Sequence, residues 1–299
     1  MRRLCAFWWR QRPSEKRANA FSDGLCVFLF SFFSRRSIML GSAIGDIAGS
    51  RFEFDNCRST DFEFIHPDCD FTDDTVCTAA VAEWVAQGCG GGLARMLQGW
   101  CRRYPHPKGS YGGRFAHWIG MAEPQPYNSW GNGSAMRVSA VGWAFASLDE
   151  VLRHAAESAA VTHNHPEGIK GAQAVAAAIF WARSGRDKAF VRKQIRERFG
   201  YALDAGCDAI RAANTFDESC MKTVPDALAA FFESENFEHA VRLAVSLGGD
   251  SDTIAAITGS IAEAYYRDIP AAIVRQTLAI LPEDIARALA SVKEAAPSV

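Results

Sequence analysis

The chain has 299 residues and a formal net charge of -2, and 48% of its residues are hydrophobic. This is enough apolar material for a packed core, and the near-neutral charge excludes the strongly basic surface typical of proteins that bind nucleic acid or acidic membranes. The nine cysteines are scattered and form no C-x-x-C pair. They predict reduced thiols in a cytoplasmic protein and no structural zinc.

The first 38 residues differ in composition from the rest of the chain. An arginine-rich start is followed by a phenylalanine-rich apolar run over residues 25–33, and then by Arg35 and Arg36. The run is too short to span a membrane, and no small-residue cleavage pattern follows it before Met39. We expect residues 1–38 to be a disordered or misassigned N-terminal extension, with a signal peptide or anchor as the alternative. Residues 39–299 are expected to form a single domain.

Helical periodicity dominates the sequence after Met39. Apolar residues recur at spacings of three and four, and alanine is frequent, which is typical of amphipathic helices. Strand-like alternation is confined to residues 52–64, where a short hairpin is the alternative. The predicted helices cover residues 74–87, 148–161, 166–184, 186–199, 240–247, 252–266 and 282–293. The sequence thus predicts an all-α bundle, with functional groups gathered in its loops.

Two short acidic motifs open predicted helices. The first, FTDDT at residues 71–75, is explained by capping alone, because Thr72 is a good N-cap and acids in a first turn favour the helix dipole. The second, GGDSDT at residues 248–253, repeats paired acids and threonine at another helix start. Adjacent carboxylates repel each other, which raises a pKa or requires a cation.

Together the two motifs suggest a metal site. If they converge, they supply four carboxylates and a threonine hydroxyl from each motif, hard oxygen ligands that favour Mg²⁺ or Mn²⁺ over zinc or copper. A pair of such ions can turn a water molecule into a nucleophile. The helix after the second motif is expected to be central, because it carries small residues that permit close helix approach: Ala255, Ala256, Gly259, Ser260 and Ala262.

An apolar segment with Gly41, Gly45 and Gly49 precedes the first acidic motif. These glycines either let helices touch or serve a site, and their spacing does not fit dinucleotide binding, because no strand precedes them. Glu53 follows this segment and lies close in sequence to Asp73. Its carboxylate is therefore a candidate to reach the metals or a substrate.

The segment NSWGNGSAMR, residues 128–137, places glycines and small hydroxyls beside Trp130. Backbone amides in such a loop can hold a phosphate, and the indole ring can stack on a base or ribose. Asn-Gly pairs are also common in plain turns, so this signal alone is weak. Arg137 is more typical of a structural ion pair than of a phosphate ligand.

Two imidazoles stand close together in THNHPE, residues 162–167. Their spacing is compatible with a transition metal, but no cysteine or third histidine is near. A helix start at Pro166 is the simpler interpretation for His165. His163 remains a candidate to hydrogen-bond a ligand.

Taken in order, the motifs FTDDT, WGNGSAMR (130–137), TH (162–163) and SLGGDSDT (246–253) resemble the ADP-ribosylglycohydrolase family. This family includes dinitrogenase-reductase-activating glycohydrolases and the ADP-ribosylarginine and ADP-ribosylserine hydrolases. The resemblance runs from about residue 39 to residue 266. It implies a compact all-α multi-helix bundle with a binuclear Mg²⁺ or Mn²⁺ centre in a cleft. The implied activity is hydrolysis of an N- or O-glycosyl bond that releases ADP-ribose from a modified acceptor.

The resemblance also assigns residues to roles. The family's metal ligands match Thr72, Asp73, Asp74, Asp250, Asp252 and Thr253. Glu53 matches an acid tied to catalysis and to closure of the site, and the catalytic base is Glu53 or one of the aspartates, with Asp73 and Asp252 as candidates. Contacts to ADP-ribose match Tyr111, Gly112, Gly113, Ser129, Trp130 and His163. Arg114 departs from the pattern, because a second glycine is common there.

Two other functions fit parts of the same pattern. A dinuclear-metal phosphohydrolase would use a similar oxygen cluster, but such sites usually recruit histidines, and none flanks Asp73 or Asp250. A non-catalytic ADP-ribose-binding protein is the other alternative, and the intact acidic motifs argue against it. We expect a cytoplasmic monomer whose partner is an ADP-ribosylated protein or small molecule, with no membrane and no indication of nucleic acid.

Overall fold

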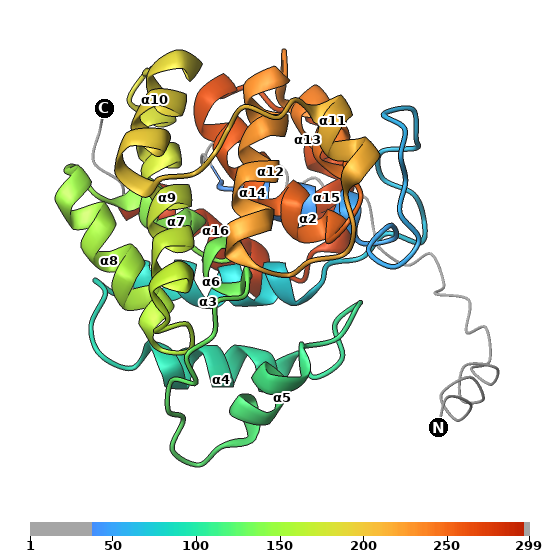
Figure 1. Ribbon diagram of the computed structural model, residues 1–299. Coiled ribbons are helices and arrows are strands. Elements are labelled where there is room, and N and C mark those ends of the chain that lie inside the picture. The colour runs from blue at the N-terminus through green and yellow to red at the C-terminus, as the bar shows by residue number, and fades with distance from the viewer. Residues whose placement is uncertain (1–37, 296–299) are drawn as a thin grey trace, which may run out of the picture. The chain divides into compact units, whose positions relative to one another are not determined.

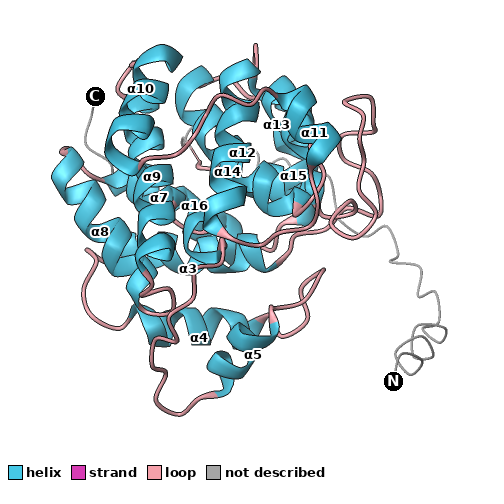
Figure 2. Cartoon of the chain, in the orientation of Figure 1, coloured by secondary structure: helices cyan, strands magenta, loops and turns pink. Residues whose placement is uncertain are grey.

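The computed structural model describes residues 38–295, which contain helices joined by turns and loops and no strand (Figures 1 and 2). The chain divides into two units, residues 1–36 and 37–299, and everything described belongs to the second. The predicted extension, residues 1–38, lies outside the described residues apart from Ile38. None of the described helices combines the length and apolar character that crossing a membrane requires.

The all-α prediction is confirmed, and every helix expected from periodicity is present. The helices are α2 (Gly41–Gly49), α3 (Asp73–Ala86), α4 (Leu93–Arg103), α5 (Gly113–Gly120), α6 (Gly133–Met136), α7 (Ser139–Ala144), α8 (Leu148–Ala160), α9 (Pro166–Arg183), α10 (Lys188–Phe199), α11 (Cys207–Ala213), α12 (Cys220–Glu233), α13 (Phe237–Ser246), α14 (Ser251–Tyr266), α15 (Ala271–Ile280) and α16 (Glu283–Ala295).

Two local expectations need correction. Residues 52–64 form bends and turns, so the hairpin considered there is absent. The loop expected over residues 128–137 contains α6, and the glycine loop that includes Gly112 and Gly113 leads directly into α5. Helices α4 and α5 pack together, and α4 also packs on α3, as their neighbouring positions in Figure 1 show.

Helix α14 is central, as its small residues predict: it is buried from Ser251 to Ala264 and packs against α2, α9, α12 and α13. Its contact with α2 is made by backbone. A Cβ atom on Gly41 would lie 2.2 Å from the Gly259 carbonyl oxygen, and one on Gly45 would lie 2.0 Å from the Ala255 carbonyl oxygen. These glycines are therefore needed for helix contact, and the contact fixes the N-terminus of α14 beside α2.

Candidate functional site

The N-terminus of α3 is held by its own cap and by α2. The Thr72 hydroxyl accepts a hydrogen bond from the Asp74 N–H at 3.1 Å, which is the predicted cap. Asp46, fully buried on α2, accepts hydrogen bonds at Oδ2 from the Thr72 N–H (3.0 Å), the Thr75 N–H (3.1 Å) and the Thr75 hydroxyl (2.5 Å). Asp46 therefore fixes where the first acidic motif begins, although the sequence analysis assigned it no role.

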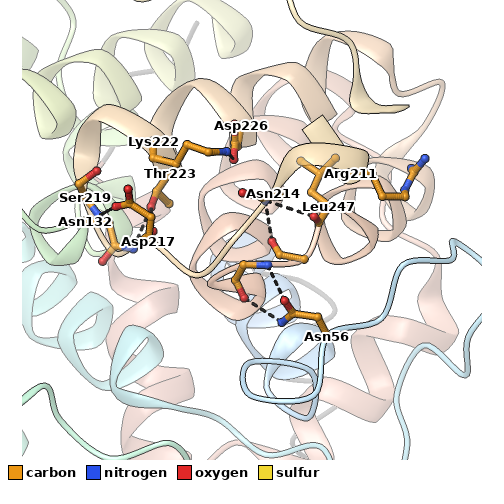
Figure 3. A network of polar contacts seen from close by, with 12 residues as sticks. Asn56, Asn132, Arg211, Asn214, Asp217, Ser219, Lys222, Thr223, Asp226 and Leu247 are labelled. Carbon is orange, nitrogen blue, oxygen red and sulfur yellow. Dashed lines mark hydrogen bonds and ion pairs between the residues drawn. The ribbon is translucent and has the colours of Figure 1, made fainter. Parts of the chain in front are cut away.

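The second acidic motif begins in a left-handed turn. Gly248 and Gly249 have φ angles of +70° and +77°, a region that favours glycine. Asp250 follows as the N-cap residue of α14, and its Oδ2 accepts a hydrogen bond of 2.6 Å from the Asn132 side-chain amide. Figure 3 shows how Asn56 and Asn214 surround the backbone of this turn.

The two motifs meet, as the sequence analysis expected. The Thr253 hydroxyl donates to Asp74 Oδ1 at 3.3 Å, which links the start of α14 to the start of α3. Residues of both motifs and of the loop after α2 line one cavity of about 260 Å³. We call the residues of the two motifs and of this loop that line the cavity the acidic wall: Glu53, Asp73, Asp74, Asp250, Asp252 and Thr253; Glu218, which the sequence analysis did not single out, lines the cavity as well. Thr72 does not line this cavity and acts in the structure as the cap.

The acidic wall concentrates negative charge in a buried place. Burial, together with repulsion from neighbouring carboxylates, raises the pKa of Asp73, Asp74 and Asp252 well above the usual aspartate value. Burial, then repulsion by Asp250 and Asp46, raises the pKa of Glu53 to about 7. Among the side chains that the structure describes, residues 38–292, no lysine or arginine forms an ion pair with the aspartates of this wall.

The donor chemistry of the acidic wall fits hard divalent cations. Asp74 Oδ2 is buried without a hydrogen-bond partner, so this oxygen is free to bind an ion. Carboxylates mixed with a threonine hydroxyl are the oxygen ligands that Mg²⁺ and Mn²⁺ prefer. In the described part of the chain, however, no group of three or more His, Cys, Asp or Glu side chains is already arranged as a metal site.

Other residues that line the cavity can donate hydrogen bonds, and we call Gly112, Gly113, Ser129, Arg137 and His163 the donor wall. His163 lies there, and burial with the nearby charge of Arg137 lowers its pKa well below the usual value, so the imidazole is neutral. The Thr162 hydroxyl accepts a hydrogen bond from Arg137 Nη2 at 2.9 Å and lies 2.7 Å from His163 Nδ1. When the hydroxyl donates to Nδ1, the imidazole carries its proton on Nε2 and His163 is a hydrogen-bond donor.

Other predicted substrate contacts divide between two spaces. Gly112, Gly113 and Ser129 line the same cavity as His163. Trp130 does not; its side chain is 47% exposed and lines an adjoining cavity of about 280 Å³, which shares Ser129 with the first. The Tyr111 hydroxyl is turned away and donates to the Tyr104 carbonyl at 2.7 Å.

Two further residues that the sequence singled out, His165 and Arg137, have structural roles. His165 caps α9 by accepting a hydrogen bond from the Glu167 N–H at Nδ1, as expected for a helix start. Arg137 is fully buried and donates to the Ser158 carbonyl and to Thr162, so no carboxylate pairs with it. The ion-pair interpretation of Arg137 is therefore wrong, and its role in the structure is to hold Thr162.

Comparison with known proteins agrees with this arrangement. The ADP-ribosylglycohydrolase family model matches residues 35–297. The chain belongs to the ADP-ribosylglycohydrolase family. This family is hydrolytic, so the chain is an enzyme of the class that hydrolyses ADP-ribose linkages.

Similar proteins include the ADP-ribosylarginine hydrolase Tri1 of Pseudomonas putida, which is 29% identical over 77% of this chain and 70% of that protein. ADP-ribosylhydrolase ARH3 of Xenopus tropicalis is 24% identical over 77% of this chain and 86% of its own length. An uncharacterised Archaeoglobus fulgidus protein is 34% identical over 154 residues, and this match spans half the length of that protein. A solved ADP-ribosylglycohydrolase-related protein complex superposes with a TM-score of 0.64 at 25% identity, covering 86% of this chain and 95% of that one.

Proposed function

We propose that the chain is a metal-dependent hydrolase that cleaves the glycosidic bond between ADP-ribose and a modified acceptor and releases ADP-ribose. The observation that carries the proposal is the convergence of both acidic motifs and Glu53 on one cavity whose other wall holds His163 and Ser129. A carboxylate wall suits cations, and a donor wall suits a diphosphate. Both are needed to hold ADP-ribose next to divalent ions.

The acidic wall would hold two Mg²⁺ or Mn²⁺ ions. Candidate ligands are Thr72, Asp73, Asp74, Asp250, Asp252 and Thr253. When bound, the ions would supply Lewis-acid polarisation of a water molecule and of ribose hydroxyls. Thr72 would take part only by sharing a hydroxyl that already accepts a hydrogen bond from Asp74.

Glu53 is the preferred base. It lies outside both acidic motifs, and in the described residues no hydrogen bond holds its carboxylate. That carboxylate is therefore free to accept a proton from the water that attacks the anomeric carbon of the ribose. Asp73 and Asp252 remain the alternative bases, because both line the same cavity. The bond to the acceptor breaks as the new bond to water oxygen forms, and the proton that Glu53 took from the water passes to the departing acceptor, so that ADP-ribose and the acceptor leave in their neutral forms at that bond.

The donor wall would bind the rest of ADP-ribose. The His163 Nε2–H group is suited to donate to a diphosphate oxygen, and α5 starts at Gly113 with no side chain capping its first N–H groups. Ser129 lines both cavities, so a ligand can pass from one to the other beside it. Trp130 would stack on the base in the adjoining cavity.

The test is a comparison of substrates. The purified protein is incubated with Mg²⁺ or Mn²⁺ and, separately, with arginine-linked, serine-linked and nucleic-acid-linked ADP-ribose, and released ADP-ribose is quantified by chromatography. Arginine comes first because one relative is named an ADP-ribosylarginine hydrolase. We expect metal-dependent release of intact ADP-ribose from at least one substrate. Release of AMP or phosphate would instead support a phosphohydrolase, and tight ADP-ribose binding without turnover would support a binding protein.

We also propose that the protein acts in the cytoplasm as a monomer. The cysteines among residues 38–295 are free thiols, including Cys77 and Cys101 in the core. Free thiols suit a reducing compartment. Sedimentation of the purified protein at several concentrations tests the monomer, and a mass that rises with concentration would contradict it.

A further inference from the structure

The side chain of Asn56 is paired with the peptide group of Gly249. Its Nδ2 donates to the Gly249 carbonyl at 2.9 Å, and its Oδ1 accepts from the Gly249 N–H at 2.8 Å (Figure 3). An amide satisfies both groups at once, whereas an aspartate has no donor for the carbonyl. Asn56 therefore stabilises the left-handed turn at Gly248 and Gly249, which places Asp250 at the cavity.

The same amide also reaches the segment that carries Glu53. Asn56 Nδ2 lies 2.7 Å from the Phe52 carbonyl oxygen and 3.2 Å from the Glu53 carbonyl oxygen. One side chain thus joins two stretches of backbone that are 193 residues apart in sequence. Each stretch carries a residue of the acidic wall, Glu53 on one and Asp250 on the other.

A second asparagine holds the turn without this connection. Asn214 Nδ2 donates to the Leu247 carbonyl at 3.2 Å and to the Gly248 carbonyl at 3.0 Å. No hydrogen bond joins Asn214 to Phe52 or Glu53 among the described residues. Asn214 is therefore a matched control, because it supports the same turn from the other side, as Figure 3 shows.

We propose that Asn56 is a positioning residue that sets Glu53 relative to the Asp250 turn. The inference rests on the proposed function only in that it takes Glu53 as the base. Because no hydrogen bond holds the Glu53 carboxylate itself, its place depends on the backbone that Asn56 fixes. A misplacement of about 1 Å of a reacting group can cost on the order of 100-fold in rate.

A double-mutant cycle tests the coupling. Asn56→Leu removes every hydrogen bond of the amide and should lower kcat roughly 10- to 100-fold, with a smaller change in KM. The same substitution in Glu53→Gln protein should have little further effect, because the base is already lost. Asn214→Leu should lower kcat by the same factor in both backgrounds. If Asn56→Leu lowers kcat by the same factor in the parent protein and in the Glu53→Gln protein, the proposal is overturned.

Hydrogen exchange tests the link without turnover, so it separates a failure of this inference from a failure of the proposed function. The Phe52 N–H donates to the Gly49 carbonyl at 2.8 Å, so we expect it to be protected from exchange in the metal-free protein. Asn56→Leu should speed its exchange by roughly tenfold, about the effect of one lost hydrogen bond, whereas Asn214→Leu should not. If Asn56→Leu does not fold, Asn56→Ser gives the same comparison. Unchanged exchange at Phe52 in the folded variant would contradict the link.

Discussion

The two walls of the cavity differ in the kind of buried polar group that lacks a partner, which is a carboxylate oxygen on one and a guanidinium N–H on the other. On the acidic wall, Asp74 Oδ2 is buried without a partner, and beneath it Asp46 Oδ1 is buried in the same state. On the donor wall, Arg137 Nε is also buried without a partner, while Arg137 Nη2 donates to the Thr162 hydroxyl, which lies 2.7 Å from His163 Nδ1. Unpartnered buried carboxylates are costly. Under the proposed function, cations would offset this cost on the acidic wall, whereas the contacts among Arg137, Thr162 and His163 on the donor wall form without a ligand.

The largest expected effect comes from Asp252→Asn, which removes one charge from the acidic wall at nearly constant size. Turnover should be abolished, and affinity for Mn²⁺ should fall by about 100-fold or more. The metal-free variant should melt no lower than the parent protein, because the repulsion by Asp250 and Asp74 is relieved. Titration calorimetry with Mn²⁺ measures the affinity, and unchanged affinity and stoichiometry would exclude Asp252 as a ligand.

Glu53→Gln separates the base from the metal ligands. Metal and ADP-ribose binding should persist, since both acidic motifs and the donor wall are untouched. Turnover should fall by roughly two to four orders of magnitude if Glu53 accepts a proton in the transition state. ADP-ribose affinity, Mn²⁺ affinity and turnover are measured on the same preparation. Full activity would remove Glu53 from catalysis, and joint loss of metal and ADP-ribose would make it a ligand.

The geometry of the acidic wall also depends on the contact between α2 and α14. Gly45→Ala would place a Cβ atom 2.0 Å from the Ala255 carbonyl oxygen, so the helices must separate. The free energy of unfolding should fall by about 1–3 kcal/mol, and Mn²⁺ affinity should fall with it. Gly99→Ala on α4 is the control, since nothing lies within 4 Å of its Cβ position. Chemical denaturation of both variants checks this, and equal stability would contradict the role of the glycine.

The smallest effect is expected on the donor wall. Thr162→Val removes the hydroxyl that joins Arg137 to His163 and frees the imidazole to change tautomer. ADP-ribose affinity should fall by roughly tenfold at most, while Mn²⁺ affinity stays the same. Thr162→Ser, which keeps the hydroxyl, should retain the parent affinity. Weaker Mn²⁺ binding in the valine variant would show that the two walls are not independent.

Helices α3, α8, α9, α10, α13, α14 and α16 were predicted because their apolar periodicity is local in sequence, whereas α4, α5, α7, α11, α12 and α15 were not among the predicted ranges. Helix α12 was missed because Pro225 lies inside it and proline normally ends a helix. Asp46 was missed because acids on helices usually face solvent. The sequence did contain a sign of this role, because Asp46 is the one charged residue in an otherwise apolar segment. In the structure every residue of α2 is buried.

The meeting of the acidic motifs was predictable from their chemistry, since each is costly without a shared cation. The residues that hold these motifs in place were not predictable from the sequence. Asn56 and Asn132 act on Gly249 and Asp250, which are far away in sequence, so only the tertiary fold pairs them. Likewise, the sequence placed Trp130 with the phosphate contacts, but only packing determines that its ring faces an adjoining cavity.

The most direct test of the binuclear centre is to strip the full-length protein with a chelator and titrate Mn²⁺ back while turnover of arginine-linked or serine-linked ADP-ribose is followed. The proposed function predicts two ions bound per chain, no turnover without metal, and recovery of turnover as the ions bind. ADP-ribose should still bind the stripped protein weakly through the donor wall. Full turnover in the stripped protein, or no Mn²⁺ binding at all, would contradict a metal centre on the acidic wall.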